Sequence, residues 1–249
     1  FEQMEMQFFV PPGTELKFYE EWKQKRLNWH LALGLGQENY KFHDHEKLAH
    51  YANAAADIEF KFPFGFKELE GIHSRTDFDL SAHEKFSGRK LQYFDPERNE
   101  NYVPYVVETS IGLDRMFLAL FSNCLKDEVL EDGSERTVLS LPPALAPVKA
   151  AILPLVKKDG LPEFAEKIFN DLKYDFNVIS EEKDSIGKRY RRQDAIGTPF
   201  CITVDHDSLT DGTVTLRERD TMKQERVKVE DLRRIIDEKV NFRTLLSKI

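Results

Sequence analysis

The chain has 249 residues, a formal net charge of −8, and 41% hydrophobic and 32% charged residues, which is enough for two domains of ordinary size. It contains no apolar run near the roughly 18 to 20 residues that a membrane span needs, and its acidic first residues lack the basic region of a secretory signal. Cys124 and Cys201 lie far apart in apolar surroundings, so we expect a cytoplasmic protein with reduced, buried thiols.

The first 62 residues predict a mixture of strands and helices. Residues 1–10 alternate between polar and apolar side chains, which is the period of a half-buried strand. Thr14 is expected to cap a helix whose apolar stripe ends at Gly34. A second helix is predicted over His45 to Ala56, followed by a strand over residues 58–62.

The next segment predicts a short helix, two strands and a long helix. Ser81 and Glu84 have the spacing of a capping box, and LQYF and YVPYVVETS predict antiparallel strands joined by the turn-rich DPERNEN. The apolar run from Ile111 to Leu125 predicts a helix. The charged residues 126–140 are expected to form a linker.

Beyond the linker, strands and helices alternate. VKAAILPLV predicts a buried strand, and Pro162 suits the first turn of a helix. VIS, a basic helix around residues 188–192, FCITVD, TVTLRER, RVKV and a last helix from Glu230 then predict a three-layer domain with a mixed sheet. We therefore expect two domains, residues 1–140 and 141–249. The first carries 16 Lys and Arg against 25 Asp and Glu, and the second 20 against 19.

Three segments combine residues suited to chemistry. In FEQME, the strand period directs Gln3 and Glu5 to one side, where an amide and a carboxylate suit an ammonium group. FGFKELEGIHSRTDFDL crowds charge at Glu68, Glu70, Arg75, Asp77 and Asp79, a composition that suits magnesium and phosphates. Each segment also has a purely structural interpretation: FEQME as a solvated strand face, and FGFKELEGIHSRTDFDL as a salt-bridged surface loop.

The third segment is ETSIGLDRMFLALF. A strand delivers Glu108 and Ser110 to a glycine turn, and the following helix presents Arg115. An arginine fixed on a buried helix is a permanently charged phosphate clamp. The alternative is a purely structural arginine at the start of a helix.

Taken in this order, the segments resemble those of class II aminoacyl-tRNA synthetases and, in their wording, those of glycyl-tRNA synthetases of the dimeric type. FEQME resembles the tail of motif 2, ELEGIHSRTDFDL the ATP-loop signature, ETSIGLDR motif 3, and KRYRRQDAIGTPFCITVD the anticodon domain. The resemblance implies an α/β (α+β) chain: a partial class II catalytic domain built on an antiparallel sheet, followed by a mixed-sheet α/β anticodon-binding domain.

The resemblance also implies an activity in protein biosynthesis. A glycine–tRNA ligase activates glycine with ATP and Mg²⁺ and transfers it to the 3′ end of glycine tRNA, and the full-length enzyme is a cytoplasmic homodimer. Glycine has no side chain to recognise, so selectivity must come from binding its ammonium group and excluding a methyl group.

The family's functional positions carry over as follows. Glycine contacts are expected at Phe1, Glu2, Gln3, Met4, Glu5, Arg75, Glu108, Thr109, Ser110, Ile111 and Gly112. ATP contacts are expected at Phe1, Glu68, Leu69, Gly112, Leu113, Asp114 and Arg115; Arg115 and Glu68 are the candidate catalytic residues, and Glu68 is the candidate Mg²⁺ ligand. Lys188, Arg189, Arg191 and Arg192 are expected to contact the tRNA backbone.

Two departures from the family pattern stand out. Thr109 replaces a proline, which is a mild change because the backbone can remain extended. The chain also begins inside motif 2, so motif 1 and the motif 2 arginine that binds the α-phosphate are absent from it. We therefore expect a fragment that is inactive by itself.

Other interpretations remain open. A non-catalytic nucleic-acid-binding protein on a class II body, like the accessory subunit of mitochondrial DNA polymerase, would have lost its site residues. A synthetase for threonine, proline or histidine has a related anticodon domain. His43, His45 and His50 are compatible with zinc, although their spacing fits no standard site, and surface or RNA-facing histidines are the alternative.

Overall fold

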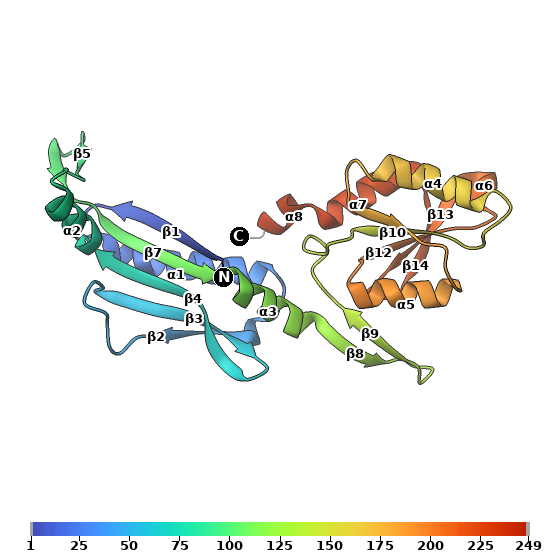
Figure 1. The fold of residues 1–249 in the computed structure, drawn as a ribbon, viewed down its shortest axis with the longest axis horizontal. Helices are drawn as coiled ribbons and strands as arrows, with labels where there is room; N and C mark the ends of the chain where they lie inside the picture. The colour runs from blue at the N-terminus through green and yellow to red at the C-terminus, as the bar shows by residue number, and fades with distance from the viewer. Residues whose placement is uncertain (1, 248–249) are drawn as a thin grey trace. The chain divides into compact units, whose positions relative to one another are not determined.

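The computed structural model describes residues 2–247. The chain divides into two compact units between Ser122 and Asn123. Both units mix helices with sheets (Figure 1), so the predicted α/β (α+β) class is confirmed.

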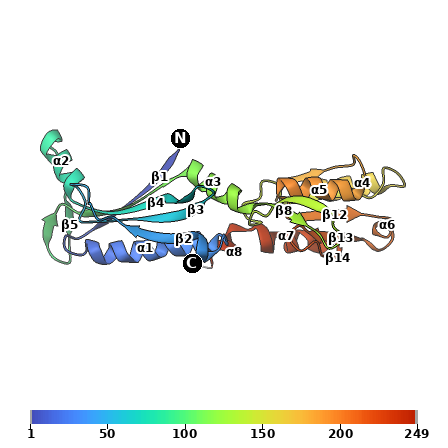
Figure 2. The same ribbon diagram turned by 90° about the horizontal axis from the view of Figure 1, so that it is seen from below.

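The first unit is an antiparallel five-stranded sheet with one long helix on one face. The strand order is β1 (Gln3–Val10), β7 (Tyr105–Gly112), β4 (Gly65–Thr76), β3 (Ala54–Phe62) and β2 (Tyr40–Asp44). Helix α1 (Glu15–Ala32) runs along one face of this sheet (Figure 2). The other elements are η1 (Gln37–Asn39), α2 (Phe78–Ser87), the hairpin β5 (Tyr93–Asp95) and β6 (Glu100–Tyr102), and α3 (Leu113–Cys124).

Helix α1 is held to the sheet by aromatic packing and by a buried ion pair. The ring of Phe8 packs edge-on against Phe18 and Trp22, with centroid distances of 5.4 and 5.5 Å. Glu70 of β4 is fully buried; its carboxylate accepts hydrogen bonds from Arg26 Nε at 2.5 Å and pairs with His30 Nε2 at 2.7 Å. Burial raises the pKa of Glu70, but the hydrogen bonds from His30 and Arg26 outweigh burial, and the pKa is lowered.

The second unit is a three-layer domain around a mixed sheet. The strand order is β11 (Val178–Ser180), β10 (Ala150–Pro154), β12 (Phe200–Val204), β13 (Thr213–Glu218) and β14 (Gln224–Lys228). The first three strands are parallel, and β13 and β14 are antiparallel additions. The remaining elements are the hairpin β8 (Leu125–Val129) and β9 (Glu135–Leu139), α4 (Leu161–Leu172), α5 (Ile186–Ile196), α6 (Ser208–Asp211), η2 (Val229–Asp231), α7 (Leu232–Val240) and α8 (Phe242–Leu246).

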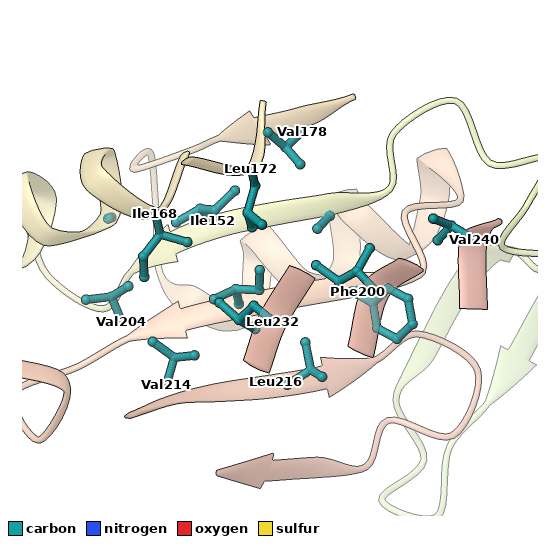
Figure 3. Packing of buried hydrophobic residues seen from close by; sticks show 14 of the residues in the cluster. Ile152, Ile168, Leu172, Val178, Phe200, Val204, Val214, Leu216, Leu232 and Val240 are labelled. Carbon is teal, nitrogen blue, oxygen red and sulfur yellow. The ribbon is translucent and has the colours of Figure 1, made fainter. Parts of the chain in front are cut away.

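Alternation along the buried strands separates the two helical layers. Ile152 packs with residues of α4 and α7, including Leu172 and Leu232 (Figure 3), whereas Leu153 on the opposite face packs near Tyr190 of α5. The predicted mixed sheet and its three layers are confirmed.

Several local predictions in the first unit were wrong. Residues 45–53 form no helix, because Ala54–Ala56 already belong to β3 and pair with β4. Thr14 occupies the N-cap position of α1, but its hydroxyl donates to Pro11 O at 2.7 Å and caps no helical N–H. Helix α2 begins before the predicted capping box, so Ser81 lies inside it. The antiparallel hairpin predicted across DPERNEN forms between β5 and β6, with Tyr93 opposite Tyr102, but residues 105–112 leave it and join the main sheet as β7.

The predicted linker is a β-hairpin. Its strand β9 packs against α5, and Arg136 on it is buried, donating to Asp194 Oδ2 at 3.1 Å and to Arg219 O at 2.9 Å. These contacts place residues 125–139 with the second unit, although their charged composition is typical of a solvated connection.

Both cysteines are buried and unpaired. Burial raises the pKa of Cys201 to about 12. Across residues 2–247, the helices are too short or too polar for any of them to cross a membrane.

Candidate functional site

The face of the first sheet opposite α1 carries a row of polar side chains. In the β1–β7 register, Gln3 lies opposite Gly112, Glu5 opposite Ser110, and Gln7 opposite Glu108. Residues at every second position of a strand point to the same face. The alternation predicted for the first ten residues therefore places Gln3, Glu5 and Gln7 on the open face, together with Ser110 and Glu108.

A cavity of about 400 Å³ opens at one end of this face. Residues from all three chemistry-bearing segments line it: Glu2, Gln3, Glu68, Leu69, Ser110, Gly112, Asp114 and Arg115. Gln3 Nε2 donates to Ser110 Oγ at 2.5 Å, and the Leu113 N–H donates to Glu2 O at 3.0 Å. These bonds join the start of β1 to the turn between β7 and α3.

A β-bulge decides which acidic residue of β4 reaches the cavity. Glu70 pairs with Ile58 and Glu68 with Glu59, so Leu69 is the extra residue of the strand. Without the bulge, Glu68 and Glu70 would share a face; with it, Glu68 faces the cavity and Glu70 faces α1. The expectation that Glu70 belongs with the site's charged cluster was therefore wrong.

Arg115 lies in the first turn of α3 and contacts Glu68. Its Nη1 donates to Glu68 O at 2.6 Å and lies 3.4 Å from Glu68 Oε2. The side chains of Arg115 and Glu68 are 53% and 55% exposed, so this is a weak surface pair. An incoming anion can engage the free part of the guanidinium fork.

Donors from two neighbouring strands engage both oxygens of the Glu108 carboxylate. Oε2 accepts a hydrogen bond from Gln7 Nε2, and Oε1 accepts one from Arg75 Nη1 at 3.1 Å. His73 Nδ1 lies 3.8 Å from Oε1. Burial lowers the pKa of His73 more than the Glu108 charge raises it, which favours the neutral imidazole.

Arg75 is itself positioned by several groups. Its Nε donates to Asp79 Oδ2 at 2.8 Å, and its guanidinium lies 4.2 Å from the centroid of the Tyr51 ring. The Asp79 hydrogen bond and the Glu108 charge raise the pKa of Arg75, against the effect of burial. Arg75 is the extra residue of a second register shift in β4, between Ser74 and Thr76, which is how it reaches Glu108.

Sequence reasoning missed Gln7 and His73 as neighbours of Glu108. The signal for Gln7 was present, since it continues the alternation of Gln3 and Glu5. Nothing in the sequence pointed to His73, whose place depends on the β4–β7 register that pairs it with Glu108.

The side chains of three expected glycine contacts do not reach the open face. Met4 pairs with Ile111, and Met6 with Thr109, so the side chains of Met4, Thr109 and Ile111 point to the α1 side, where Thr109 and Ile111 are buried. Only the backbone of these three residues is available to a substrate on the open face. Phe1 lies outside the described residues.

The histidines do not form a metal site in the part of the chain that the structure describes: residues 2–247 contain no group of three or more His, Cys, Asp or Glu placed to hold an ion. His45 Nε2 lies 2.9 Å from Asp57 Oδ2, His43 Nδ1 lies 3.3 Å from Glu59 Oε1, and the His50 ring packs edge-on against Phe78. Glu68 does not need such a group, because Mg²⁺ is commonly bound by one or two carboxylates together with substrate phosphates.

The basic residues of α5 differ in burial: Arg189 is buried and has a structural role, whereas Lys188, Arg191 and Arg192 are at least partly accessible to solvent. Arg189 is 2% exposed, and its Nη1 donates to Pro154 O at 2.8 Å and to Glu181 O at 3.0 Å. The expectation that Arg189 contacts tRNA was therefore wrong, because carbonyls at the ends of the sheet strands use this guanidinium. Arg192 pairs with Asp184 at 2.9 Å, Arg191 Nη2 lies 3.4 Å from Ser134 Oγ, and Lys188 is exposed.

Comparison with known proteins shows which sequences this chain is similar to. Residues 149–239 match the family model described as "Anticodon binding domain". The chain is 56% identical over 228 residues to a glycine–tRNA ligase of Chlorobaculum tepidum, covering 91% of this chain and 48% of that protein. It is 53% identical to those of Macrococcus caseolyticus, over 244 residues, and Clostridium perfringens, over 248 residues; both matches cover 97% of this chain, and 52% and 53% of those proteins.

The chain thus spans about half the length of the curated relatives that it matches. The resemblance carried by FEQME, ELEGIHSRTDFDL and ETSIGLDR is confirmed. Over nearly its whole length the chain is a homologue of the glycine–tRNA ligases, and its residues 149–239 belong to the anticodon-binding domain family.

Proposed function

We propose that the chain provides glycine and ATP contacts and the anticodon-binding domain of a glycine–tRNA ligase, an aminoacyl-tRNA synthetase acting in the cytoplasm as a homodimer. One observation carries the proposal: segments that are far apart in the sequence meet around one cavity, in a chain more than half identical to proteins of that name. Glycine's carboxylate would attack the α-phosphate of ATP, and the terminal ribose hydroxyl of the tRNA would then accept the glycyl group.

Glycine binding is assigned to the open face beside the cavity. Glu5 and Glu108 are the carboxylates available to its ammonium group, Arg75 is the cation nearest Glu108, and Gln3 and Ser110 provide polar atoms at the cavity. A charged hydrogen-bond partner contributes about 1.5 to 3 kcal/mol. This range is enough for the ammonium group to determine affinity in a ligand without a side chain.

ATP binding is assigned to the cavity itself. Arg115 would bind the terminal phosphate, Glu68 would hold the Mg²⁺ that ATP brings, and Leu69, Gly112 and Asp114, which line the cavity, would provide further contacts, together with Leu113 between the last two in the sequence. When bound, Mg²⁺ would neutralise part of the negative charge of the phosphates. The residues of the chain then act by positioning and by electrostatic stabilisation, which can account for most of the catalysis in such a reaction.

The second unit is assigned to glycine tRNA. With Arg189 excluded by burial, Lys188, Arg191 and Arg192 are the remaining candidates on α5 for contacts with the tRNA backbone. Contacts of this kind make binding strongly dependent on salt.

A hybrid enzyme tests the proposal. The 228-residue region of the Chlorobaculum tepidum ligase that aligns with this chain is replaced by the corresponding residues of this chain. We expect this hybrid ligase to exchange pyrophosphate into ATP only when glycine is present, and to charge glycine tRNA. A folded hybrid that binds glycine tRNA but forms no adenylate would instead support a non-catalytic nucleic-acid-binding protein.

A further inference from the structure

A second hollow in the first unit lies at the far end of β1. It has a volume of about 600 Å³, and Phe9, Leu91, Tyr93 and Tyr102 are among the residues that line it. Phe9 is 55% and Tyr93 53% exposed, and the rings of Tyr93 and Tyr102 lie with centroids 5.8 Å apart. The hollow is therefore an aromatic surface that is open to solvent.

Positive charge adjoins this aromatic surface. Through the shared residue Gln92, the hollow continues into a second one lined by Lys85, Arg89 and Lys90. Within residues 2–247, no carboxylate forms an ion pair with these three cations. The acidic residue beside them, Glu84, accepts a hydrogen bond from the Leu91 N–H at 2.7 Å. The aromatic residues Phe9, Tyr93 and Tyr102, with Arg89 and Lys90, form what we call the aromatic–basic groove.

The neighbouring hairpin carries three carboxylates, Asp95, Glu97 and Glu100, and one arginine, Arg98. Asp95 Oδ2 lies 3.7 Å from Arg98 Nε, and Glu100 Oε1 lies 3.7 Å from Arg98 Nη1, so Arg98 offsets one of these negative charges. Among the described residues the hairpin carboxylates form no ion pair with Arg89 or Lys90, which leaves these two cations available to an external anion. The Lys85 ammonium lies 5.6 Å from the centroid of the Phe86 ring.

The groove lies on the same face of β1 as the proposed substrate residues. Phe9 continues the row of Gln3, Glu5 and Gln7, because alternate residues of a strand share a face. Gln3 and Phe9 are six positions apart, so the groove lies about 20 Å along the strand from the cavity, at about 3.3 Å per residue.

We propose that the aromatic–basic groove binds the single-stranded 3′ end of the tRNA as it approaches the cavity, an inference that rests on the proposed function. Unpaired bases expose faces that stack on aromatic side chains, and phosphates pair with adjacent cations. A duplex would offer phosphates but would keep its base faces hidden. The combination of open rings and unpaired cations therefore selects a single strand.

The test measures binding of the 249-residue chain to a fluorescein-labelled single-stranded RNA with the sequence of the tRNA 3′ end, by anisotropy at several salt concentrations. Tyr93→Ala should weaken binding at least about fivefold, the lower range for loss of one stacked base, and Tyr93→Phe should restore it. Arg89→Ala with Lys90→Ala should lower the slope of log affinity against log salt by about 1.4, or about 0.7 per lost phosphate contact.

A matched control removes two charges elsewhere on the same unit. Lys25→Ala with Lys61→Ala changes two exposed lysines outside the groove and should leave the affinity and the salt slope unchanged. If the control weakens binding as much as the groove variants do, the binding is non-specific electrostatics and the proposal fails.

Two further measurements distinguish RNA binding in the groove from tRNA binding by the second unit and from self-association. A glycine-tRNA anticodon stem-loop should bind every variant equally; loss of stem-loop binding by the unmodified chain would count against the proposed function, not the groove. If the groove variants change the molar mass by light scattering and leave RNA affinity unchanged, the groove is a contact between copies of the chain, and the proposal is overturned.

Discussion

Arg115 is the residue whose geometry best fits phosphate binding. It donates to Glu68 O at 2.6 Å through Nη1, so the same guanidinium is anchored on one side and available on the other. Lysine keeps the charge but loses the planar fork. In the hybrid ligase, Arg115→Lys should lower the rate of glycine-dependent exchange at least about tenfold, equivalent to about 1.4 kcal/mol of lost stabilisation.

Arg98→Lys is the control for this change. Arg98 is a half-exposed arginine on the β5–β6 hairpin with two carboxylate neighbours, and its replacement should leave exchange unchanged. Near-normal exchange with Lys at position 115 would assign Arg115 a structural role only.

Glu108 is tested through its charge. Gln7 and Arg75 engage its two oxygens, so the amide of Glu108→Gln fills the same space without the charge and presents a donor where an acceptor is needed. The glycine KM of the hybrid ligase should rise at least about tenfold, the lower end for loss of a hydrogen bond to a charged group. The KM for ATP should change little, and Glu100→Gln on the exposed hairpin should change neither value.

At the residue scale, the sequence predicted those site residues whose position depends on local periodicity. Gln3 and Glu5 follow from strand alternation, and Arg115 follows from its distance after the glycine turn. Glu70 and Arg189 were misplaced because a bulge and a set of backbone carbonyls decide their environments. Neither feature can be read from residue spacing, since the bulge depends on the pairing of Glu70 with Ile58 in the neighbouring strand and Arg189 depends on Pro154, 35 positions away.

At the scale of elements, the buried Glu70 connects α1 to β4. Removing its charge by Glu70→Gln leaves Arg26 and His30 without their carboxylate partner. Breaking a buried pair by removing one partner costs about 3 to 5 kcal/mol. We expect the free energy of unfolding at pH 7, from urea titration, to fall by about 3 kcal/mol, while Glu68→Gln on the same strand, where the side chain is half exposed, should cost little.

The lowered pKa of Glu70 also gives a pH dependence with a definite sign. Because the folded-state pKa lies below the ordinary value of 4.5, Glu70 contributes its full stabilisation above about pH 4.5, and this is lost as the pH falls through the folded-state pKa. The unmodified chain should therefore lose stability below pH 4.5 more steeply than Glu70→Gln. If the free energy of unfolding falls equally steeply below pH 4.5 in the two proteins, Glu70 is not the group responsible.

The element predictions succeeded where hydrophobic pattern and turn residues agreed. The buried strands at residues 150–154 and 200–204 and the helix after Pro162 are examples. The prediction that residues 126–140 form a linker was wrong. Their exposed positions are charged, and the buried contact of Arg136 with Asp194 cannot be recognised without the fold. The alanine-rich end of His45–Ala56 suggested a helix, but tertiary pairing with β4 placed Ala54–Ala56 in a strand.

At the scale of the whole molecule, the question is where the second unit begins. Composition predicted a boundary after residue 140, whereas the compact units divide between Ser122 and Asn123. Asp194 has no exposed surface, and its carboxylate binds both Arg217, at 2.8 and 2.9 Å, and Arg136, at 3.1 Å. A segment starting at residue 141 keeps Arg217 and loses Arg136.

We therefore expect residues 123–247 to unfold cooperatively by themselves, and residues 141–247 to be less stable by about 3 kcal/mol, the lower range for removing one partner of a buried ion pair. Urea unfolding monitored by circular dichroism compares the two segments. Arg136→Met in the longer segment removes the guanidinium but keeps the hairpin, so it should account for most of the difference. Equal stability of the two segments would show that the hairpin is a linker after all, and a large loss on truncation with none for Arg136→Met would assign the stabilisation to apolar packing of β9 against α5.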